Sequence, residues 1–290
     1  MRSRPDDGTP ATGGARATGD AHATDGLDGR GVLYPTRLPR FTRLPAPAVV
    51  ADLVAWFWIP EWDLPDGRSS RQHLIAFPAS NLVVEGGTVT VSGPSTRASH
   101  RDLAGRGWAV GALLRPAAVP ALLADPGALV DGERVVDAPD LAEAVGTAMR
   151  GEDDRHERAV AAVVAWLGDR VPEPDAEALT ANALADVVSS DSAVLRVEDA
   201  AAAVGVSVRT AQRLARRYVG LSPLAMIRRR RLQEAAERVR LEPGAVLADV
   251  AADLGYADHA HLTRDFRDVL GMTPTAYRSR SARPTPGPAV

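Results

Sequence analysis

The chain has 290 residues, 45% of them hydrophobic and 24% charged, which suits two domains with buried cores. It contains no cysteine, which excludes disulfides, thiolate metal sites and cysteine nucleophiles, and its 34 basic residues are all arginine, which excludes a catalytic lysine. The net charge of −3 is unevenly divided: residues 1–191 hold 18 arginines and 27 acidic residues, whereas residues 192–290 hold 16 arginines and 10 acidic residues.

The N-terminal segment, residues 1–34, consists mainly of Gly, Ala, Thr, Asp and Arg, a composition typical of a disordered tail. Arg2 and Arg4 are not followed by an apolar run, so we do not expect a secretory signal. Nor does the chain hold the ~18 consecutive apolar residues of a membrane span. We therefore expect a cytoplasmic protein, with a second tail at residues 282–290.

Residues 35–136 contain short apolar runs broken by glycine and proline, a pattern that predicts a β-rich domain, either a barrel or a sandwich. The clearest runs are 81–85, 88–91 and 108–114. Gly86 and Gly87 stand between two of these runs and predict a two-residue hairpin turn.

Four aromatic residues lie between positions 56 and 62, and three of them, Trp56, Trp58 and Trp62, are candidates for the wall of an effector pocket. The structural alternative, which we favour, is that they pack along a strand. His73, His100 and Glu85 are the ligand-like residues of this region, but they lack metal-site spacing, so we expect no metal and no cofactor.

Helical periodicity begins after Pro139-Asp140. Residues 154–170 place Val160, Val163, Val164 and Leu167 on one apolar face, which must be buried either on the β-rich domain or in a homodimer. Pro172 and Pro174 then interrupt the chain, and a further helix is predicted over 176–188. We place the first domain at 35–171 and the second at 175–281.

Two similar segments follow, at 197–214 and 247–266. Each has a short Ala-rich helix with Ala201 or Ala251 at a close crossing, a glycine suited to a left-handed turn, Gly205 or Gly255, and a second polar helix. Small apolar cores are predicted from Val204, Val206 and Leu214 and from Leu254, Tyr256, Leu262 and Phe266, with Ser207 as a helix cap. This is the helix-turn-helix pattern, in which the second helix enters the major groove.

The exposed side chains of these units suit base edges and phosphates, since arginine pairs with guanine and glutamine with adenine. The basic run 228–231 adds two arginines that could reach phosphates, whereas Arg231 is expected to pack through its stem. The candidate DNA-binding residues are Ser207, Arg209, Gln212, Arg213, Arg216, Arg229, Arg230, His259, His261, Thr263 and Arg264.

Each unit is also followed by a related sequence, Gly220-Leu221-Ser222-Pro223 and Gly271-Met272-Thr273-Pro274. With these motifs, residues 175–281 resemble the AraC family of bacterial transcription regulators. Residues 56–58 and 114–123, together with their place in the chain, resemble the cupin-like sensor domains that precede this DNA-binding domain in many members.

The resemblance implies an α+β protein with two domains. A β-rich N-terminal domain with a helical connector would sense a small-molecule effector or mediate dimerisation, and an all-α domain would bind double-stranded DNA. RNA polymerase would be a further partner of an activator. The competing interpretation is a small-molecule-binding or enzymatic β-barrel whose helices serve assembly, but we expect no enzyme.

Overall fold

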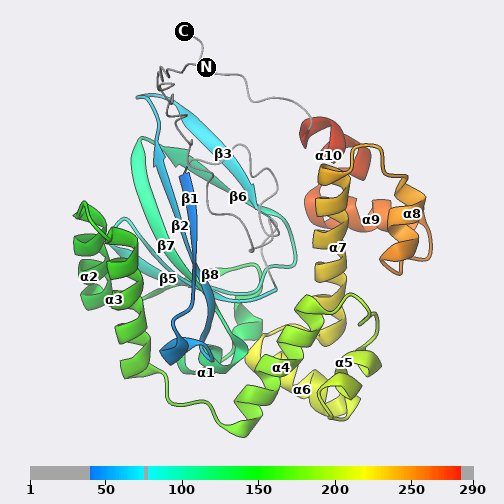
Figure 1. Ribbon diagram of the computed structural model, residues 1–290, viewed down its shortest axis with the longest axis horizontal. Helices are drawn as coiled ribbons and strands as arrows, with labels where there is room; N and C mark the ends of the chain where they lie inside the picture. Colours follow the sequence, from blue (N-terminus) through cyan, green and yellow to red (C-terminus); the bar gives the residue numbers. More distant parts are fainter. Residues whose placement is uncertain (1–39, 75–77, 282–290) are drawn as a thin grey trace, which may run out of the picture.

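The N-terminal half of the molecule is built on an antiparallel sheet. The computed structural model describes residues 40–74 and 78–281. Six strands follow the order β1-β2-β7-β4-β5-β8, and β3 and β6 form a separate two-stranded sheet (Figure 1). The strands are β1 (Arg40–Pro45), β2 (Val54–Asp63), β3 (Ser69–Leu74), β4 (Asn81–Glu85), β5 (Thr88–Ser92), β6 (Ser99–Ala104), β7 (Arg106–Leu114) and β8 (Glu133–Val136). Since the six-stranded sheet is open, the two sheets are compatible with the sandwich alternative rather than with a closed barrel.

The predicted hairpin turn is confirmed. Glu85 pairs with Thr88, and both Gly86 and Gly87 have positive φ, 57° and 80°, as a two-residue turn between twisted strands requires. Alternate side chains of the sheet, such as Phe57, Ile59 and Val84, are buried completely on one face. The three predicted strand runs therefore correspond to β4, β5 and β7.

Two helices, α2 (Pro139–Arg150) and α3 (Arg155–Arg170), lie side by side along this sheet (Figure 1). Val160, Val163 and Leu167 of α3 are at most 6% exposed and belong to the same hydrophobic core as the strands. The apolar face of α3 is thus buried within its own chain, and the hypothesis that it forms a homodimer interface is wrong.

Short helical turns complete this domain: 3-10 turns at Ala48–Val50, Pro116–Ala118 and Pro126–Leu129, and the short helix α1 (Val119–Leu122). The predicted tails, 1–34 and 282–290, lie outside the described residues. Within the described part of the chain, no helix is both long and apolar enough to cross a bilayer.

The C-terminal half is entirely helical and has two separate hydrophobic cores. Its helices are α4 (Ala176–Ser190), α5 (Val197–Ala203), α6 (Val208–Tyr218), α7 (Pro223–Leu241), α8 (Leu247–Asp253), α9 (His259–Leu270) and α10 (Pro274–Ser281). The long helix α7 runs from the group α4–α6 to the group α8–α10 (Figure 1). Leu232 and Val239 of α7 contribute to the second core, and Met226 and Ile227 to the first.

The β-rich half of the chain contacts both helical groups, one near α4 and the other near α9. Near α4, the buried side chain of Asn182 accepts a hydrogen bond from the backbone N–H of Ala117 (2.9 Å) and donates one to the carbonyl of Asp52 (2.9 Å). Near α9, the backbone N–H of Ala98 donates to the carbonyl of Val269 (2.8 Å). The β-rich domain is therefore joined to each helical group by hydrogen bonds from its loops.

Candidate nucleic-acid interface

The first helix-turn-helix unit consists of α5, a turn at Gly205 and α6. Gly205 has a φ of 69°, the left-handed conformation predicted for it. Ala201 is 2% exposed, so α5 crosses closely over the helix that follows. The side chain of Ser207 accepts a hydrogen bond from the backbone N–H of Thr210 (3.1 Å) and begins α6, as predicted.

The second unit consists of α8, a turn at Gly255 and α9. Gly255 has a φ of 71° and lies under Leu195, whose Cδ1 would be 2.8 Å from an added Cβ. The cap of α9 is Asp258, which accepts a hydrogen bond from the backbone N–H of His261 (2.7 Å). The backbone hydrogen bonds from His261 and Ala260 lower the pKa of Asp258. This cap was not predicted from the sequence.

From the cap onward, the two units repeat with a spacing of 51 residues. Ser207 corresponds to Asp258, and the buried Ala211 and Ala215 correspond to Leu262 and Phe266. The repeat continues past the unit, because Ser222 and Thr273 each cap the helix that begins at the following proline. The turn is one residue longer in the second unit, since the glycines are only 50 residues apart.

This correspondence aligns the exposed side chains of the two recognition helices. Arg213 matches Arg264, Gln212 matches Thr263, and Arg216 matches Arg267. The four arginines are exposed. Arg267 was missed by the sequence analysis, although the repeat itself could have identified it.

The predicted residues of the first recognition helix, Arg209, Gln212, Arg213 and Arg216, are all exposed. Arg213, however, lies in an ion-pair network with the neighbouring helix α4. Glu177 accepts hydrogen bonds from Arg213 (Nη2 to Oε2, 2.8 Å) and from Arg217 (Nη1 to Oε1, 2.7 Å). The hydrogen bond from Arg213 lowers the pKa of Glu177.

In the second recognition helix, His259, His261 and Arg264 are exposed and Thr263 is partly buried. His259 is the first residue of α9. The rings of His261 and Tyr256 are nearly perpendicular, with 5.3 Å between their centroids. No described acidic residue forms an ion pair with Arg264 or Arg267.

The prediction that Arg229 and Arg230 bind DNA is wrong for this conformation, because they are only 4% and 2% exposed. Arg229 donates to the backbone carbonyls of Arg97 (3.1 Å) and Thr96 (3.4 Å) in the β-rich domain. Burial lowers the pKa of Arg229 to about 10. Arg230 pairs with Glu234 (3.0 Å) and donates to a backbone carbonyl, so both arginines support packing.

The other arginines of the run 228–231 also have partners. Arg231 packs its guanidinium 4.1 Å from the ring centroid of Tyr256 and donates to the carbonyl of Leu254, which confirms its structural role. Arg228 is half exposed and binds the carboxylate of Asp265, which is 2% exposed, through Nε (3.0 Å) and Nη2 (2.5 Å). Asp265 occupies the position that Leu214 has in the first unit.

The three candidate tryptophans do not share one pocket. Trp56 lines a hollow between the β-rich domain and α4, α6 and α7, beside Arg43 and Arg115. Trp62 lines a second hollow, beside α2. Trp58 covers Gly111, and its Nε1 donates to the side-chain oxygen of Asn81 (3.1 Å). Trp58 therefore packs along the sheet, as the structural alternative predicted.

The metal candidates of the β-rich region belong to two different sheets. His73 and His100 are backbone partners in β3 and β6, and Glu85 lies on β4. Among the described residues, no group of three potential ligands is close enough to hold a metal ion.

Family models match both halves of the chain. Residues 200–280 match a helix-turn-helix domain, and residues 42–135 match a domain of unknown function (DUF6597). A putative AraC-like transcription regulator of Streptomyces lividans is 34% identical over 128 residues, 44% of this chain and 40% of the relative. The transcriptional activator NphR of Rhodococcus is 37% identical over 89 residues, 31% of this chain and 26% of the relative. The matched part thus spans less than half the length of these relatives.

Solved structures of similar proteins are also AraC-type regulators. One from Chromobacterium violaceum has 22% identity and a TM-score of 0.34, and the match covers 37% of this chain and 96% of that chain. ToxT of Vibrio cholerae has 9% identity and a TM-score of 0.37, and the match covers 83% of this chain and 96% of that chain.

Proposed function

We propose that this chain, whose C-terminal part carries an AraC-type helix-turn-helix domain, is a sequence-specific DNA-binding transcription regulator. The observation that carries the proposal is the repeat at a spacing of 51 residues. It presents Arg213 and Arg216 on one recognition helix and Arg264 and Arg267 at the same positions of the other.

Each recognition helix would lie in a major-groove segment, where arginine and glutamine side chains reach base edges. In the first unit, the side chains that would contact DNA are Arg209, Gln212, Arg213 and Arg216, with the hydroxyl of Ser207 close to the backbone phosphates. In the second unit, the corresponding side chains are His259, His261, Thr263, Arg264 and Arg267. Base contacts would specify the sequence, and arginine contacts to phosphate would fix the register.

The length of α7 supports simultaneous binding by both units. Its 19 residues span about 28 Å at 1.5 Å per residue. Successive major-groove segments on one face of DNA are about 34 Å apart. A connecting helix of this length therefore matches two recognition helices that enter adjacent turns of the duplex.

We assign the DNA-binding unit to residues 175–281 and the controlling unit to residues 35–171. The controlling unit contacts both helical groups, through Asn182 at α4 and through Val269 at α9. An effector or a partner that moves the β-rich domain would therefore change the placement of both recognition helices.

The test is selection of DNA from a random duplex pool by the purified full-length protein. The enriched sequence should then bind at least about 10³-fold more tightly than a shuffled duplex of equal length at physiological salt. Equal affinity for the two duplexes, or no enrichment, would contradict sequence-specific binding.

A further inference from the structure

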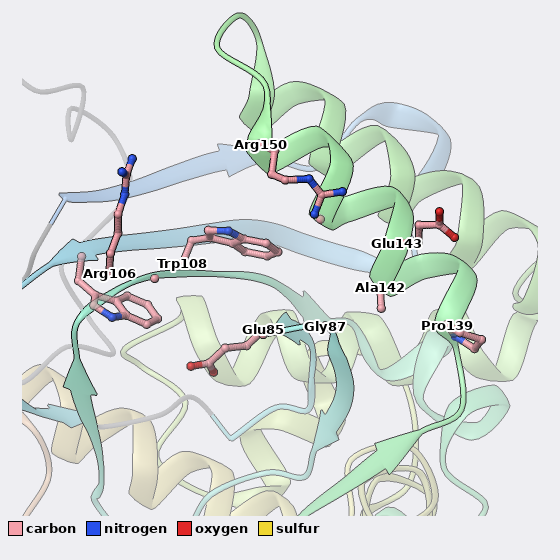
Figure 2. Close-up of a pocket in the computed structure, with 12 residues that line it drawn as sticks. Glu85, Gly87, Arg106, Trp108, Pro139, Ala142, Glu143 and Arg150 are labelled. Carbon is pink, nitrogen blue, oxygen red and sulfur yellow. The ribbon is translucent and has the colours of Figure 1, made fainter.

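Two loops of the β-rich domain leave neighbouring strands at the same end of the sheet. β5 and β8 are antiparallel, and Ser92, the last residue of β5, pairs with Glu133, the first residue of β8. The other end of β5 follows the hairpin turn at Gly87, which borders the hollow beside α2 (Figure 2). The loop after β5, residues 93–98, and the loop before β8, residues 126–132, therefore start side by side, away from that hollow. We call these two loops together the brace.

The two loops of the brace are tied to each other through their backbones. The N–H of Gly93 donates to the carbonyl of Gly132 (2.9 Å). In the opposite direction, the N–H of Asp131 donates to the carbonyl of Pro94 (3.1 Å). Gly93 also packs so closely on Leu129 that an added Cβ would overlap its carbonyl oxygen. The two loops therefore form one unit, although they lie about thirty residues apart in the sequence.

The side chain of Asp131 holds the loop 93–98 in shape. Its Oδ1 accepts hydrogen bonds from the backbone N–H groups of Thr96 (2.6 Å) and Arg97 (3.3 Å) and from the hydroxyl of Ser95 (3.3 Å). Burial would raise the pKa of Asp131, but these hydrogen bonds outweigh burial and lower the pKa, so the carboxylate is charged at neutral pH. Asp131 has a φ of 58°, and its hydrogen bonds thus fix a backbone conformation that is unfavourable for a residue other than glycine.

The loop 126–132 packs against the end of the first recognition helix. Gly220 follows α6 with a φ of 85°, and an added Cβ there would be 2.6 Å from the carbonyl carbon of Pro126. Glycine is therefore needed at this position both for its conformation and for the close approach of the loop. Val130 of the same loop packs against the hydrophobic core around Leu214. The brace thus contacts the C-terminal end of α6.

The loop 93–98 contacts the end of the second recognition helix. The backbone N–H of Ala98 donates to the carbonyl of Val269 (2.8 Å), which belongs to the last turn of α9, where a helix offers its carbonyls no internal partner. Ala98 also packs against the hydrophobic core around Phe266. Two further carbonyls of this loop accept hydrogen bonds from Arg229 of α7. The brace thus contacts the C-terminal end of α9 as well.

The repeat of 51 residues makes these two contacts comparable. Gly220 corresponds to Gly271, which lies two residues after Val269. A recognition helix of this kind reads bases mainly with its N-terminal residues. Arg209 and His259, at the N-terminal ends of α6 and α9, are exposed. The brace therefore holds both recognition helices by the ends that lie away from the base-reading residues.

We propose that the brace fixes the two recognition helices relative to one another, and that Asp131 is the positioning residue that keeps the brace in one shape. α7 joins the two units through one helix, and a second connection at a distance from that helix restricts bending and rotation about it. The consequence for DNA rests on the proposed function: two half-sites would be bound together at only one spacing and one phase.

The first test measures the placement of the recognition helices without DNA. The chain contains no cysteine, so Arg216→Cys/Arg267→Cys adds two labelling sites at corresponding exposed positions of α6 and α9. Spin labels at these sites, measured by double electron–electron resonance in the full-length protein, should give one narrow distance distribution. Asp131→Gly removes the carboxylate but suits the positive φ, and it should widen this distribution at least about twofold.

Two control variants separate the role of the carboxylate from a general effect of substitution. Asp131→Asn keeps a side-chain oxygen that can accept from the backbone N–H groups of Thr96 and Arg97, so it should keep a distribution close to the native width. Asp137→Gly replaces an exposed aspartate at the other end of β8 and should leave the distribution unchanged. Circular dichroism checks that each variant folds.

A second pair of variants tests the contact at the first unit. Gly220→Ala would push the backbone of Pro126 away, whereas Gly271→Ala places a side chain at a similar positive φ with open space around it. Only Gly220→Ala should shift or widen the distance distribution. Because the two substitutions carry the same backbone strain, the difference between them reports the contact with the brace.

With DNA, the readout is the spacing between half-sites. A duplex selected by the native protein should bind at least about tenfold more tightly than the same duplex with one base pair inserted between the half-sites. Asp131→Gly should reduce this preference to about threefold or less. It should leave the preference at individual bases unchanged, because the side chains that read them are intact.

The proposal is overturned if Asp131→Gly has the same distance distribution as the native protein, or if Asp131→Asn widens it as much as Asp131→Gly does. It is also overturned if Gly220→Ala and Gly271→Ala behave alike, or if Asp131→Gly keeps the full preference for the selected spacing. Failure of the native protein to select any DNA would contradict the proposed function alone, since the distance measurement does not involve DNA.

Discussion

The two helix-turn-helix units have the same framework but hold their recognition helices differently. In the first, Arg213 is bound by Glu177 of α4, and the core position beneath it is the apolar Leu214. In the second, no described carboxylate binds Arg264, and the equivalent core position is Asp265, which is paired with Arg228 of α7. The ion pair is on the exposed side of the recognition helix in one unit and in the core in the other. The same fold can thus carry such an ion pair on its exposed surface or use it in the core to join two helices.

The largest expected effect comes from exchanging the core residues. Leu214→Asp would bury a carboxylate without a cation and should destabilise the first unit by about 4 kcal/mol. Asp265→Leu leaves Arg228, with a half-exposed side chain, in contact with water and should cost at most about 2 kcal/mol. Urea unfolding followed by circular dichroism measures both. Equal losses in the free energy of unfolding would contradict the expectation that only the second core is built to hold a carboxylate.

The next comparison is between the corresponding arginines in DNA binding. Arg264→Ala should cost about 1–3 kcal/mol on the selected site and relax preference at one or two base pairs. Arg213→Ala should cost less, because DNA binding by the native arginine requires the loss of its contact with Glu177. Fluorescence anisotropy on selected and shuffled duplexes gives the values. If a variant lost the same affinity for the selected and the shuffled duplex, the replaced arginine would contact phosphate and not a base.

The glycine turns of the two units should differ in how much stability an alanine substitution costs, and this difference is smaller than the previous ones. Gly205→Ala and Gly255→Ala both place a side chain at positive φ, at a cost of about 1 kcal/mol. Gly255→Ala should cost about 1 kcal/mol more, because the added Cβ would be 2.8 Å from Leu195, whereas the space at Gly205 is open. Thermal unfolding of the two variants measures the difference. A larger loss for Gly205→Ala would contradict it.

The smallest expected effect comes from removing the ion pairs between Glu177 and the two arginines of the first recognition helix, Arg213 and Arg217. The lowered pKa of Glu177 keeps it ionised at neutral pH, and its pairs with Arg213 and Arg217 are lost only as the pH falls through that lowered pKa. Glu177→Gln should therefore raise DNA affinity at neutral pH by about twofold to fivefold. The matched control, Glu173→Gln, should leave the affinity unchanged. Unchanged affinity in Glu177→Gln itself would show that DNA does not compete for these arginines.

Features that depend on a few neighbouring residues could be predicted from the sequence. The positive φ of Gly205 and Gly255, the cap at Ser207 and the hairpin at Gly86-Gly87 follow from local sterics and hydrogen bonding. The bounds of α3 and α4 follow from their periodicity and the intervening prolines.

Features that depend on distant segments could not be predicted. The burial of Arg229 requires the loop at Arg97, which is 132 residues earlier in the chain. The pairing of Glu177 with Arg213 requires that α4 packs beside α6. Only the position of Asp265 had a signal in the sequence, since the repeat aligns it with a buried leucine.

The uninterrupted course of α7 has a consequence for how this protein can evolve. Its one proline, Pro223, is the first residue of the helix, and α7 contains no glycine, so each residue adds a fixed rise and a rotation of about 100° between the units. A substitution on α7 changes packing, but the insertion or deletion of a single residue rotates the second unit by about 100° relative to the first. The number of residues in α7 thus sets the orientation of the two units relative to one another, and a change of length that keeps this orientation requires about a whole helical turn.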